Sequence, residues 1–402
     1  MKLLLLFILT FGFLWVQSQS ETIKVMSYNL LNFSDDDGNR VPYLKTTMDS
    51  YMPDLLLVNE LISEEGGLLI LDSALNQNYS FAPFINGPDS DNGLFYRNDK
   101  FTFQQVTPIN TDLRDFNMYE LYYLDSAGND TVFVTCISAH LKAGSSLSNE
   151  AQRTEETQVL MTYLNQLNDP TNIILGGDFN FYNSGEGGFQ NIVNFNGYSL
   201  NDPLGNETND IDWHSNWNYA HMHTQSTRIS MFGGGANGGL DDRFDFLFVS
   251  DDLLNGGHKM RLISESYQAY GNDGNHLNDA INDLPLSNGF TQEEMDALHF
   301  FSDHLPIAAS FEMFPDNVSI SEIEDEFRFD FFIDGNQLNI ALESNQELTA
   351  SIHIYDIQGR SVLTDTLSIK KGTTFQSFPF HFVGMYFIQI PELGISNKFL
   401  NY

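Results

Sequence analysis

Five short motifs follow one another along the chain, and each carries polar residues that could take part in hydrolytic chemistry. The motifs are MSYNLLNF (26–33), DLLLVNEL (54–61), SAHLKAG (138–144), GGDFN (176–180) and SDHLP (302–306). Four of the five stand at the end of an apolar, β-type run, which predicts buried strands that bring polar groups to one edge of a sheet. The side chains they offer are Asn29, Glu60, His140, Asp178, Asn180, Asp303 and His304.

This set of side chains suits a divalent metal ion with an activated water. Hydrolysis of a phosphodiester needs a metal to neutralise phosphate charge, a base for the water, and a group that stabilises the leaving oxygen. Hard oxygen ligands favour Mg²⁺, Mn²⁺ or Ca²⁺. We expect Glu60 to be the main ligand because its carboxylate follows the apolar run LLLVN, with Asn29 and Asp303 as further ligands.

The GGDFN and SDHLP motifs supply the groups for proton transfer and phosphate binding. Because alternate residues of a strand share a face, Asp178 and Asn180 are predicted to point the same way. Asp178 can then take a proton from water while Asn180 holds a phosphate oxygen. His304 could contact the phosphate if a carboxylate orients it, and Asp245 in RFDF is the candidate.

Each residue also has an ordinary explanation. GDFN could be a strand-to-turn junction with local hydrogen bonds. Glu60 could be a solvated strand end, and His140 a histidine of the core. Only the combination, in order and at strand edges, favours a hydrolytic site.

The elements around these motifs predict a layered fold. From residue 22 to about 312, strand-like runs alternate with helix-like runs, including helices near 40–51 and 149–168. The strands near 93–106 and 118–140 are predicted to form antiparallel hairpins, and hairpins mixed with helices favour a layered α/β sandwich over an all-parallel sheet. Residues 205–240 and 256–301 are predicted to be long loops that either shape a substrate site or are inert.

The chain continues beyond this region. Residues 315–327 are predicted to be a linker because they are mainly polar and acidic. Residues 328–402 contain short, alternating, aromatic-rich strands between Gly and Asn turns, which predicts a small β-sandwich.

The N-terminus predicts export. Lys2 precedes an apolar run from Leu3 to Val16, and small residues at Val16 and Ser18 predict a signal peptide over residues 1–18. A membrane anchor is the alternative, but the run is shorter than the roughly 20 residues that span a bilayer. Cys136 is the single cysteine and lies in an apolar run, so we expect a buried free thiol.

The formal net charge is −36, with 54 acidic and 18 basic residues. Such a balance argues against tight nonspecific binding of nucleic acid, which depends on clustered Lys and Arg. A nuclease is still possible because a local cationic rim and a metal can hold one phosphate.

Together, Asn29, Glu60, His140, GDFN, RFDF and SDHLP closely resemble the endonuclease/exonuclease/phosphatase superfamily, over about residues 22–312. The resemblance implies a four-layer α/β/β/α sandwich and metal-dependent phosphoester hydrolysis. It also implies that Asn29 and Glu60 bind the metal, joined by Asp303 in some members.

The same resemblance implies roles for the other residues. Asp178 orients or deprotonates the water, Asn180 and His140 contact the phosphate, and His304, paired with Asp245, contacts the phosphate or acts as an acid. Arg114 in TDLRDF falls where several members place a phosphate-contacting arginine. Asn59 stands where the family usually has Gln before the metal-binding Glu, which leaves its supporting role open.

Residues 328–402 resemble the sorting domain that the type IX secretion system of Bacteroidetes reads. The resemblance rests on SIHIYDIQGRSVL, KKGTT, GMYFIQI and the terminal NKFLNY. It implies export across an outer membrane by that machinery. A β-sandwich that binds carbohydrate or protein is the alternative.

We therefore expect a secreted, Mg²⁺-, Mn²⁺- or Ca²⁺-dependent phosphodiesterase, first of all a nuclease, in monomeric form. Its predicted parts are a signal peptide (1–18), a catalytic domain (19–314), a linker (315–327) and a sorting β-sandwich (328–402). We expect it outside a Gram-negative bacterium or on its outer surface. A phosphomonoesterase, a sphingomyelinase-like lipid phosphodiesterase and a non-catalytic surface-binding protein are the alternatives.

Overall fold

The computed structural model describes residues 20–124, 131–167, 170–205, 211–287, 289–314, 327–334, 336–344, 347–356, 360–393 and 395–401. The chain divides into two compact units, with the boundary between Asn317 and Val318. The predicted signal peptide, and the predicted linker up to residue 326, lie outside the described residues.

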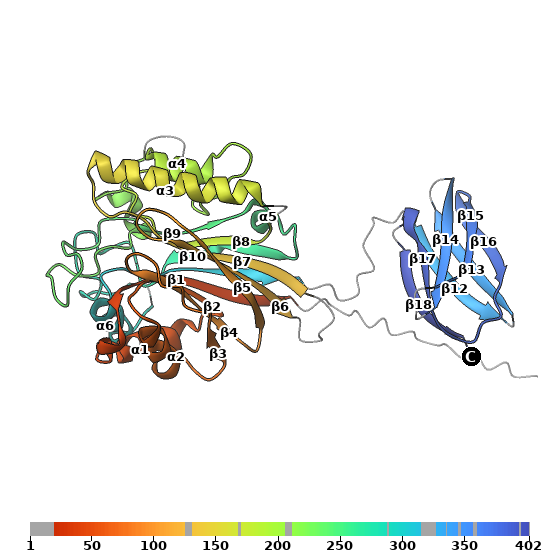
Figure 1. The fold of residues 1–402 in the computed structure, drawn as a ribbon, viewed down its shortest axis with the longest axis horizontal. Coiled ribbons are helices and arrows are strands. Elements are labelled where there is room, and N and C mark those ends of the chain that lie inside the picture. Colours follow the sequence, from red (N-terminus) through yellow and green to blue (C-terminus); the bar gives the residue numbers. More distant parts are fainter. Residues whose placement is uncertain are drawn as a thin grey trace, which may run out of the picture. The chain divides into compact units, whose positions relative to one another are not determined.

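The first unit contains a six-stranded and a five-stranded sheet packed face to face (Figure 1). The six-stranded sheet runs in the order β10 (Met260–Ala269), β11 (Ile307–Met313), β1 (Glu21–Phe33), β2 (Leu55–Leu61), β4 (Asp91–Arg97) and β3 (Tyr79–Phe81). The five-stranded sheet runs in the order β5 (Phe101–Ile109), β6 (Phe116–Leu124), β7 (Thr131–His140), β8 (Ile173–Asp178) and β9 (Asp245–Val249). Each sheet has one parallel pair, β1 with β2 and β7 with β8, and its other neighbours are antiparallel.

Helices cover the outer face of each sheet. The six-stranded sheet packs against α1 (Val41–Tyr51), α2 (Glu64–Ser73) and α6 (Gln292–Phe301), whereas the five-stranded sheet packs against α3 (Leu147–Gln166) and α4 (Gly187–Val193). The short helices η1 (Asp35–Asp37), η2 (Trp217–Met222) and α5 (Asp251–Asn255) lie in connections. The predicted four-layer α/β/β/α sandwich is confirmed.

Three apolar cores hold the layers together. One lies between the sheets and includes Val25, Leu57 and Val134, and the other two lie between each sheet and its helices. Burial of one Leu, Ile or Phe side chain contributes about 1.5–3 kcal/mol. Cys136 is a buried free thiol in the inter-sheet core, as expected.

Two predictions about elements are wrong. Residues 256–301 are not one long loop, because they contain β10 and α6. Strand β10 was not predicted because the residues in its middle are polar. The pairing of β10 with β11 is interrupted in the same region, between Ile263 and Gln268. Strands β4 and β5, predicted as a hairpin near 93–106, pair in different sheets, so the turn between them passes from one sheet to the other.

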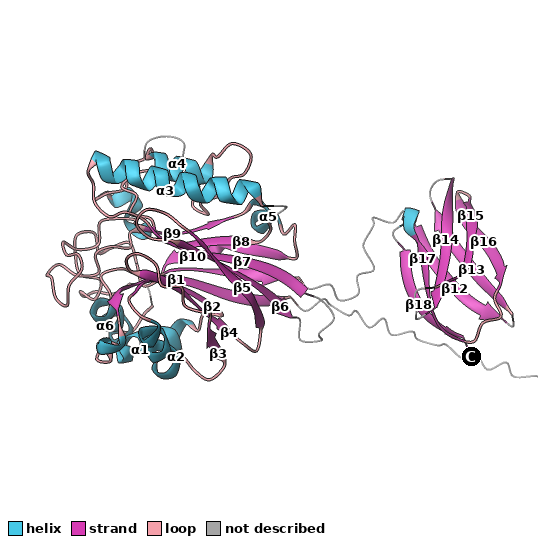
Figure 2. Cartoon of the chain, viewed as in Figure 1, coloured by secondary structure: helices cyan, strands magenta, loops and turns pink. Residues whose placement is uncertain are grey.

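The second unit is a β-sandwich, as predicted (Figure 2). One sheet contains β12 (Phe327–Asp334), β13 (Gln337–Ser344) and β16 (Gly372–Pro379). The other contains β15 (Ser361–Ile369), β14 (Leu348–Asp356), β17 (Gly384–Ile390) and β18 (Ile395–Asn401), with η3 (Pro391–Leu393) before the last strand. The unit has its own apolar core, which includes Ile340, Ile354 and Ile388. Within the described parts of the whole chain, no helix has the length and apolar character needed to span a membrane.

Candidate active site

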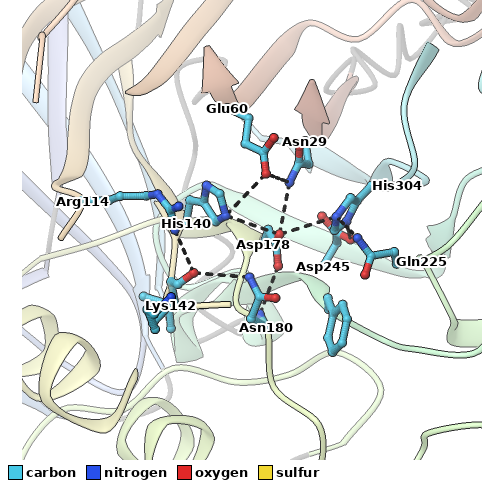
Figure 3. Close-up of polar contacts among 12 residues, drawn as sticks. Asn29, Glu60, Arg114, His140, Lys142, Asp178, Asn180, Gln225, Asp245 and His304 are labelled. Atoms are coloured by element: carbon cyan, nitrogen blue, oxygen red, sulfur yellow. Dashed lines mark hydrogen bonds and ion pairs between the residues drawn. The ribbon is translucent and has the colours of Figure 1, made fainter. Parts of the chain in front are cut away.

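The predicted site residues other than Asp303 are labelled in Figure 3, which shows them close together at one edge of the two sheets. His140 and Asp178 are the last residues of the parallel strands β7 and β8, and they face each other in the pairing register. Strand β9 is antiparallel to β8, so its first residue, Asp245, pairs with Asp178. Strand β11 is antiparallel to β1, so His304, just before β11, lies at the same edge.

The backbone is left-handed at two predicted site residues, one near the end of β2 and one two residues after β8. Glu60 has φ +58° and Asn180 has φ +53°, a left-handed conformation that costs non-glycine residues about 1 kcal/mol or more. Strand β8 ends at Asp178, so the prediction that Asp178 and Asn180 share one strand face is wrong. Instead, the Asn180 backbone N–H donates to Asp178 Oδ1 at 3.0 Å, and its Nδ2 donates to the Leu141 carbonyl at 3.3 Å.

Glu60, His140 and Asp178 form a compact donor group. His140 Nε2 lies 3.6 Å from both Glu60 Oε1 and Asp178 Oδ2, and one ligand atom from each of the three residues lies within 4.8 Å of the others. Asn29 Nδ2 donates to Glu60 Oε1 at 3.0 Å and to Asp178 Oδ2 at 3.1 Å. Two carboxylates and an imidazole are an appropriate donor set for a divalent cation.

The electrostatics of Asp178 agree with a cation at this position. Burial and, to a smaller extent, the charges of Asp245 and Glu60 raise the pKa of Asp178 to about 7, against the lowering effects of His304 and of the Asn180 backbone N–H. Buried carboxylates this close together repel one another unless a positive charge is present. The residues therefore fit a bound divalent cation.

Two predicted metal ligands have other partners in this structure. The Asn29 side-chain oxygen accepts the Leu31 backbone N–H at 2.9 Å, so the amide nitrogen faces the carboxylates. Asp303 lies outside the donor group, and its Oδ2 accepts from the Ala236 backbone N–H at 2.6 Å. Asp303 Oδ1 is buried and, among the described residues, has no hydrogen-bond partner. Ligand roles for Asn29 and Asp303 stay predictions.

The Asp245–His304 pair anticipated from the sequence is present. Asp245 Oδ2 lies 2.7 Å from His304 Nδ1, and His304 Nε2 points to Asp178 Oδ2 at 3.6 Å. Burial alone would lower the pKa of His304, but Asp245, Asp178 and Asp303 outweigh it and hold the pKa well above its ordinary value. The charges around His304 therefore favour its protonated form.

His140 has the opposite character. Burial, together with the charges of Arg114, His304 and Lys142, holds the pKa of His140 well below its ordinary value. Its Nδ1 is buried and has no partner among the described residues. His140 is therefore a neutral imidazole that can contact a phosphate or a cation through Nε2.

Arg114 lies at the rim beside His140. Its Nη1 donates to the Leu141 carbonyl at 3.2 Å, and its Nη2 forms an ion pair with Asp89 Oδ2 at 2.8 Å. Asn59, the departure from the family pattern, is buried, and its side-chain amide forms no hydrogen bond within the described part of the chain. Asn59 therefore gives Glu60 no hydrogen-bonded support.

Sequence reasoning missed several supporting residues. Ser302 Oγ donates to the Asn29 carbonyl at 2.7 Å and accepts the His304 backbone N–H at 3.1 Å, which ties two motifs together. Ser302 is the first residue of the SDHLP motif, directly before Asp303, and this position in the sequence could have indicated its role. Gln225 also reaches Asp303 and His304, but it comes from a distant loop and has no local motif.

Comparison with known protein families identifies the family of the chain. The family model described as the endonuclease/exonuclease/phosphatase family matches residues 26–304, which include four of the five motifs and the first three residues of SDHLP. The chain belongs to this family. Its members are metal-dependent phosphoester hydrolases, and the chain is an enzyme of that type.

Solved structures with a similar fold share little sequence with the chain. TDP2 of Caenorhabditis elegans is 17% identical, covers 72% of this chain and 97% of its own, and gives a TM-score of 0.45. The human Nocturnin catalytic domain, with bound sulfate, is 16% identical. The match covers 73% of this chain and 97% of the Nocturnin chain, with a TM-score of 0.44. An endonuclease/exonuclease/phosphatase family protein from Bacteroides thetaiotaomicron is 15% identical. The match covers 75% of this chain and 98% of that protein, with a TM-score of 0.43. Comparison with curated proteins finds no match.

Proposed function

We propose that the chain is an exported phosphodiesterase that works with Mg²⁺, Mn²⁺ or Ca²⁺, with nucleic acid as the first substrate to test. The supporting observation is the position of Asp178 Oδ2, which lies 3.1 Å from Asn29 Nδ2 and 3.6 Å from both His140 Nε2 and His304 Nε2. A basic carboxylate is thus surrounded by phosphate-binding groups and an acid.

Each residue has a part in this reaction. A bound divalent cation would neutralise phosphate charge and lower the pKa of water. Asp178, whose pKa is raised to about 7, orients the attacking water and accepts its proton. His140 and Asn180 hold phosphate oxygens, and Arg114 adds charge at the rim. His304, held by Asp245, donates a proton to the leaving oxygen.

One observation favours a second candidate, a phosphoesterase for small substrates. A groove of about 720 Å³ adjoins the loop that carries Arg114, and its lining includes the acidic residues Asp112, Glu155 and Glu156. Acidic walls repel further phosphates of a polynucleotide and tolerate an uncharged or cationic leaving group. The groove lies beside the predicted site and contains none of its residues, so its acidic lining disfavours a polynucleotide that runs across this rim more than it disfavours a small phosphoester.

The C-terminal unit supports the proposal of export. Its seven antiparallel strands and independent core are compatible with a sorting domain that the type IX machinery reads. We place the enzyme, on this proposal, outside a Gram-negative cell or on its outer surface. Retention of the full-length protein in the periplasm of a type IX-competent host would contradict it.

Three substrates distinguish the candidates: plasmid DNA, bis-p-nitrophenyl phosphate and p-nitrophenyl phosphate, each with Mg²⁺, Mn²⁺ or Ca²⁺. Nicking of DNA that EDTA stops supports the nuclease. Cleavage of the diester without nicking supports a small-substrate diesterase, and cleavage of the monoester alone supports a phosphatase. Inactivity on all three contradicts the proposal and favours a binding protein.

A further inference from the structure

Two carboxylates meet where the loop before β4 approaches the loop that carries Arg114. Asp91 is the first residue of β4, and Asp115 directly precedes β6. Gly87 lies between them, because a Cβ at this glycine would lie 3.1 Å from Asp91 Oδ1 and 3.5 Å from Asp115 Oδ2. One point beside the Gly87 backbone is therefore close to an oxygen atom of each carboxylate.

The Asp91 carboxylate is buried and only half satisfied. The residue is 5% exposed, and its Oδ1 accepts the Gly87 backbone N–H at 2.6 Å. Its Oδ2 is buried and has no hydrogen-bond partner among the described residues. A buried carboxylate oxygen without a partner is costly, so this atom calls for a ligand that carries positive charge or a donor hydrogen.

The electrostatics around Asp91 favour positive charge over a neutral donor. Burial and, to a smaller extent, the charges of Asp115 and Asp89 raise the pKa of Asp91 to about 6, against the lowering effect of the Gly87 backbone N–H. A neutral donor would satisfy Oδ2 but would leave the repulsion between the carboxylates in place. A cation between them would offset both.

The residue at position 87 leaves room for such a cation. Gly87 is not among the glycines with positive φ, so its backbone conformation does not require glycine. Any other residue would place its Cβ at the point that Asp91 and Asp115 share. The missing side chain thus keeps open the space between the two carboxylates.

The donors indicate which cation this space suits. Carboxylate oxygens are hard ligands, which favour Ca²⁺ or Mg²⁺ over Zn²⁺. Ca²⁺ accepts irregular geometry and bidentate carboxylates, whereas Mg²⁺ requires a nearly ideal octahedron. Two carboxylates from separate loops therefore suit Ca²⁺ better. With so few protein ligands, the expected Kd is about 0.1–1 mM, as in weak extracellular calcium modules.

We propose that Asp91 and Asp115 form a second cation site, separate from the donor group of the active site, which binds Ca²⁺ and joins the two loops. The site also bears on Arg114 at the rim of the active site. Asp115 follows Arg114 directly, and Asp89, two residues before Asp91, forms the 2.8 Å ion pair with Arg114 Nη2. A bound Ca²⁺ would thus hold in place the two loops that position this arginine.

The melting temperature of the full chain with and without Ca²⁺ tests this site. The background is Glu60→Gln/Asp178→Asn, so that cation binding in the active site does not contribute. Ca²⁺ is added to about 10 mM at pH 8, with about 0.15 M KCl to screen weak surface binding. Asp91→Asn removes one ligand charge, and Gly87→Ala keeps both carboxylates but fills the space. Asp72→Asn, at an exposed position of α2, is the matched control.

We expect Ca²⁺ to raise the melting temperature of the background protein by about 3 °C or more, and equally after Asp72→Asn. The increase should disappear after Asp91→Asn and after Gly87→Ala. Without Ca²⁺, Asp91→Asn should itself raise the melting temperature at pH 8, because it removes a buried charge whose pKa is raised on folding. Should Gly87→Ala fail to fold, Asp115→Asn replaces it.

No increase with Ca²⁺ in the background protein, or an increase that persists after Asp91→Asn or Gly87→Ala, would overturn the inference. These results say nothing against the proposed function, because no turnover is measured and the ligands of the active site are replaced. Inactivity of the wild type on every phosphoester would in turn contradict the proposed function and leave this test of Ca²⁺ binding intact.

Discussion

Two histidines of one site have opposite character because of their neighbours. Asp245, Asp178 and Asp303 raise the pKa of His304, whereas burial and nearby cationic groups lower the pKa of His140. The residue type alone does not show which histidine acts as an acid and which one contacts the phosphate. Burial and the charges around each histidine do so. The carboxylates that lie 2.7–3.6 Å from the two imidazoles come from three strands, β2, β8 and β9.

Asp178→Asn should stabilise the metal-free protein at pH 8 while it abolishes hydrolysis. The pKa of Asp178 is raised in the folded state, so the folded protein binds this proton more tightly than the unfolded chain. Its contribution to stability is present at low pH and is lost as pH rises from about 4 to about 7. Removal of the charge should raise the melting temperature at pH 8 by about 2 °C or more. An equal or lower melting temperature in the variant would contradict the assignment.

Glu60→Gln should weaken cation binding without unfolding the protein. Glu60 is partly exposed at the end of β2, and its carboxylate is in the donor group with His140 and Asp178. Loss of one charged ligand is expected to raise the cation concentration for half-maximal activity about 100-fold or more. Titration of activity with Mn²⁺ measures this, with Glu293→Gln on the surface of α6 as control. An unchanged titration curve would exclude Glu60 as a ligand.

At the level of single residues, much of the site could be predicted from the sequence. Glu60, His140, Asp178, Asp245 and His304 each stand at a strand end, and short motifs record that position. Contacts that depend on local backbone turns or distant loops could not be predicted. Asn180 leaves its strand through a positive φ, and Gln225 reaches the site only because residues far apart in sequence pair.

At the scale of elements, the site depends on a close approach of β7 and β8. A Cβ at Gly177 would lie 1.9 Å from the Ala139 carbonyl oxygen, and Gly177 has φ +155°. Only glycine allows His140 and Asp178 to end these strands side by side. The sequence indicates such strands by their apolar runs, but β10 was missed because its centre is polar.

Gly177→Ala should destabilise the first unit by about 3 kcal/mol or more, because the added methyl group overlaps backbone. Gly38→Ala is the control, since a Cβ there meets nothing within 4 Å and no positive φ is needed. Urea unfolding followed by circular dichroism measures both. Equal stabilities of the two variants would mean that β7 and β8 can move apart at no cost.

Helix α6 shows that capping signals were available in the sequence. Thr291 and Glu294 form a capping box at its start, a pattern that predicts a helix N-terminus. The proposed site owes part of its shape to this helix, since Phe301 at its end precedes Ser302 and Asp303. This capping box therefore predicts that a helix begins within residues 256–301, which were predicted to be one long loop.

At the scale of the whole molecule, chemistry and the proposed export belong to different units. All proposed site residues lie between Asn29 and His304, within the first unit, and the second unit has its own core. The strongly acidic composition gives little attraction for polyanions. Recognition of one phosphate by a cation and a few donors is compatible with such a surface.

Removal of residues 328–402 should leave the specific activity of the purified enzyme within twofold of wild type. No residue of the proposed site lies in that unit, so its loss should affect only export, and the truncated protein should accumulate in the periplasm. Activity assays and fractionation of a type IX-competent host measure both. A large loss of activity would make the second unit a substrate-binding module.

Cation-dependent turnover of bis-p-nitrophenyl phosphate tests the central claim most directly. The purified full-length enzyme is treated with EDTA, dialysed, and assayed before and after addition of Mg²⁺, Mn²⁺ or Ca²⁺, with Asp178→Asn in parallel. We expect no turnover without a cation, recovery with at least one of the three, and none in the variant. Equal turnover with and without cations, or turnover by Asp178→Asn close to wild type, would contradict the account.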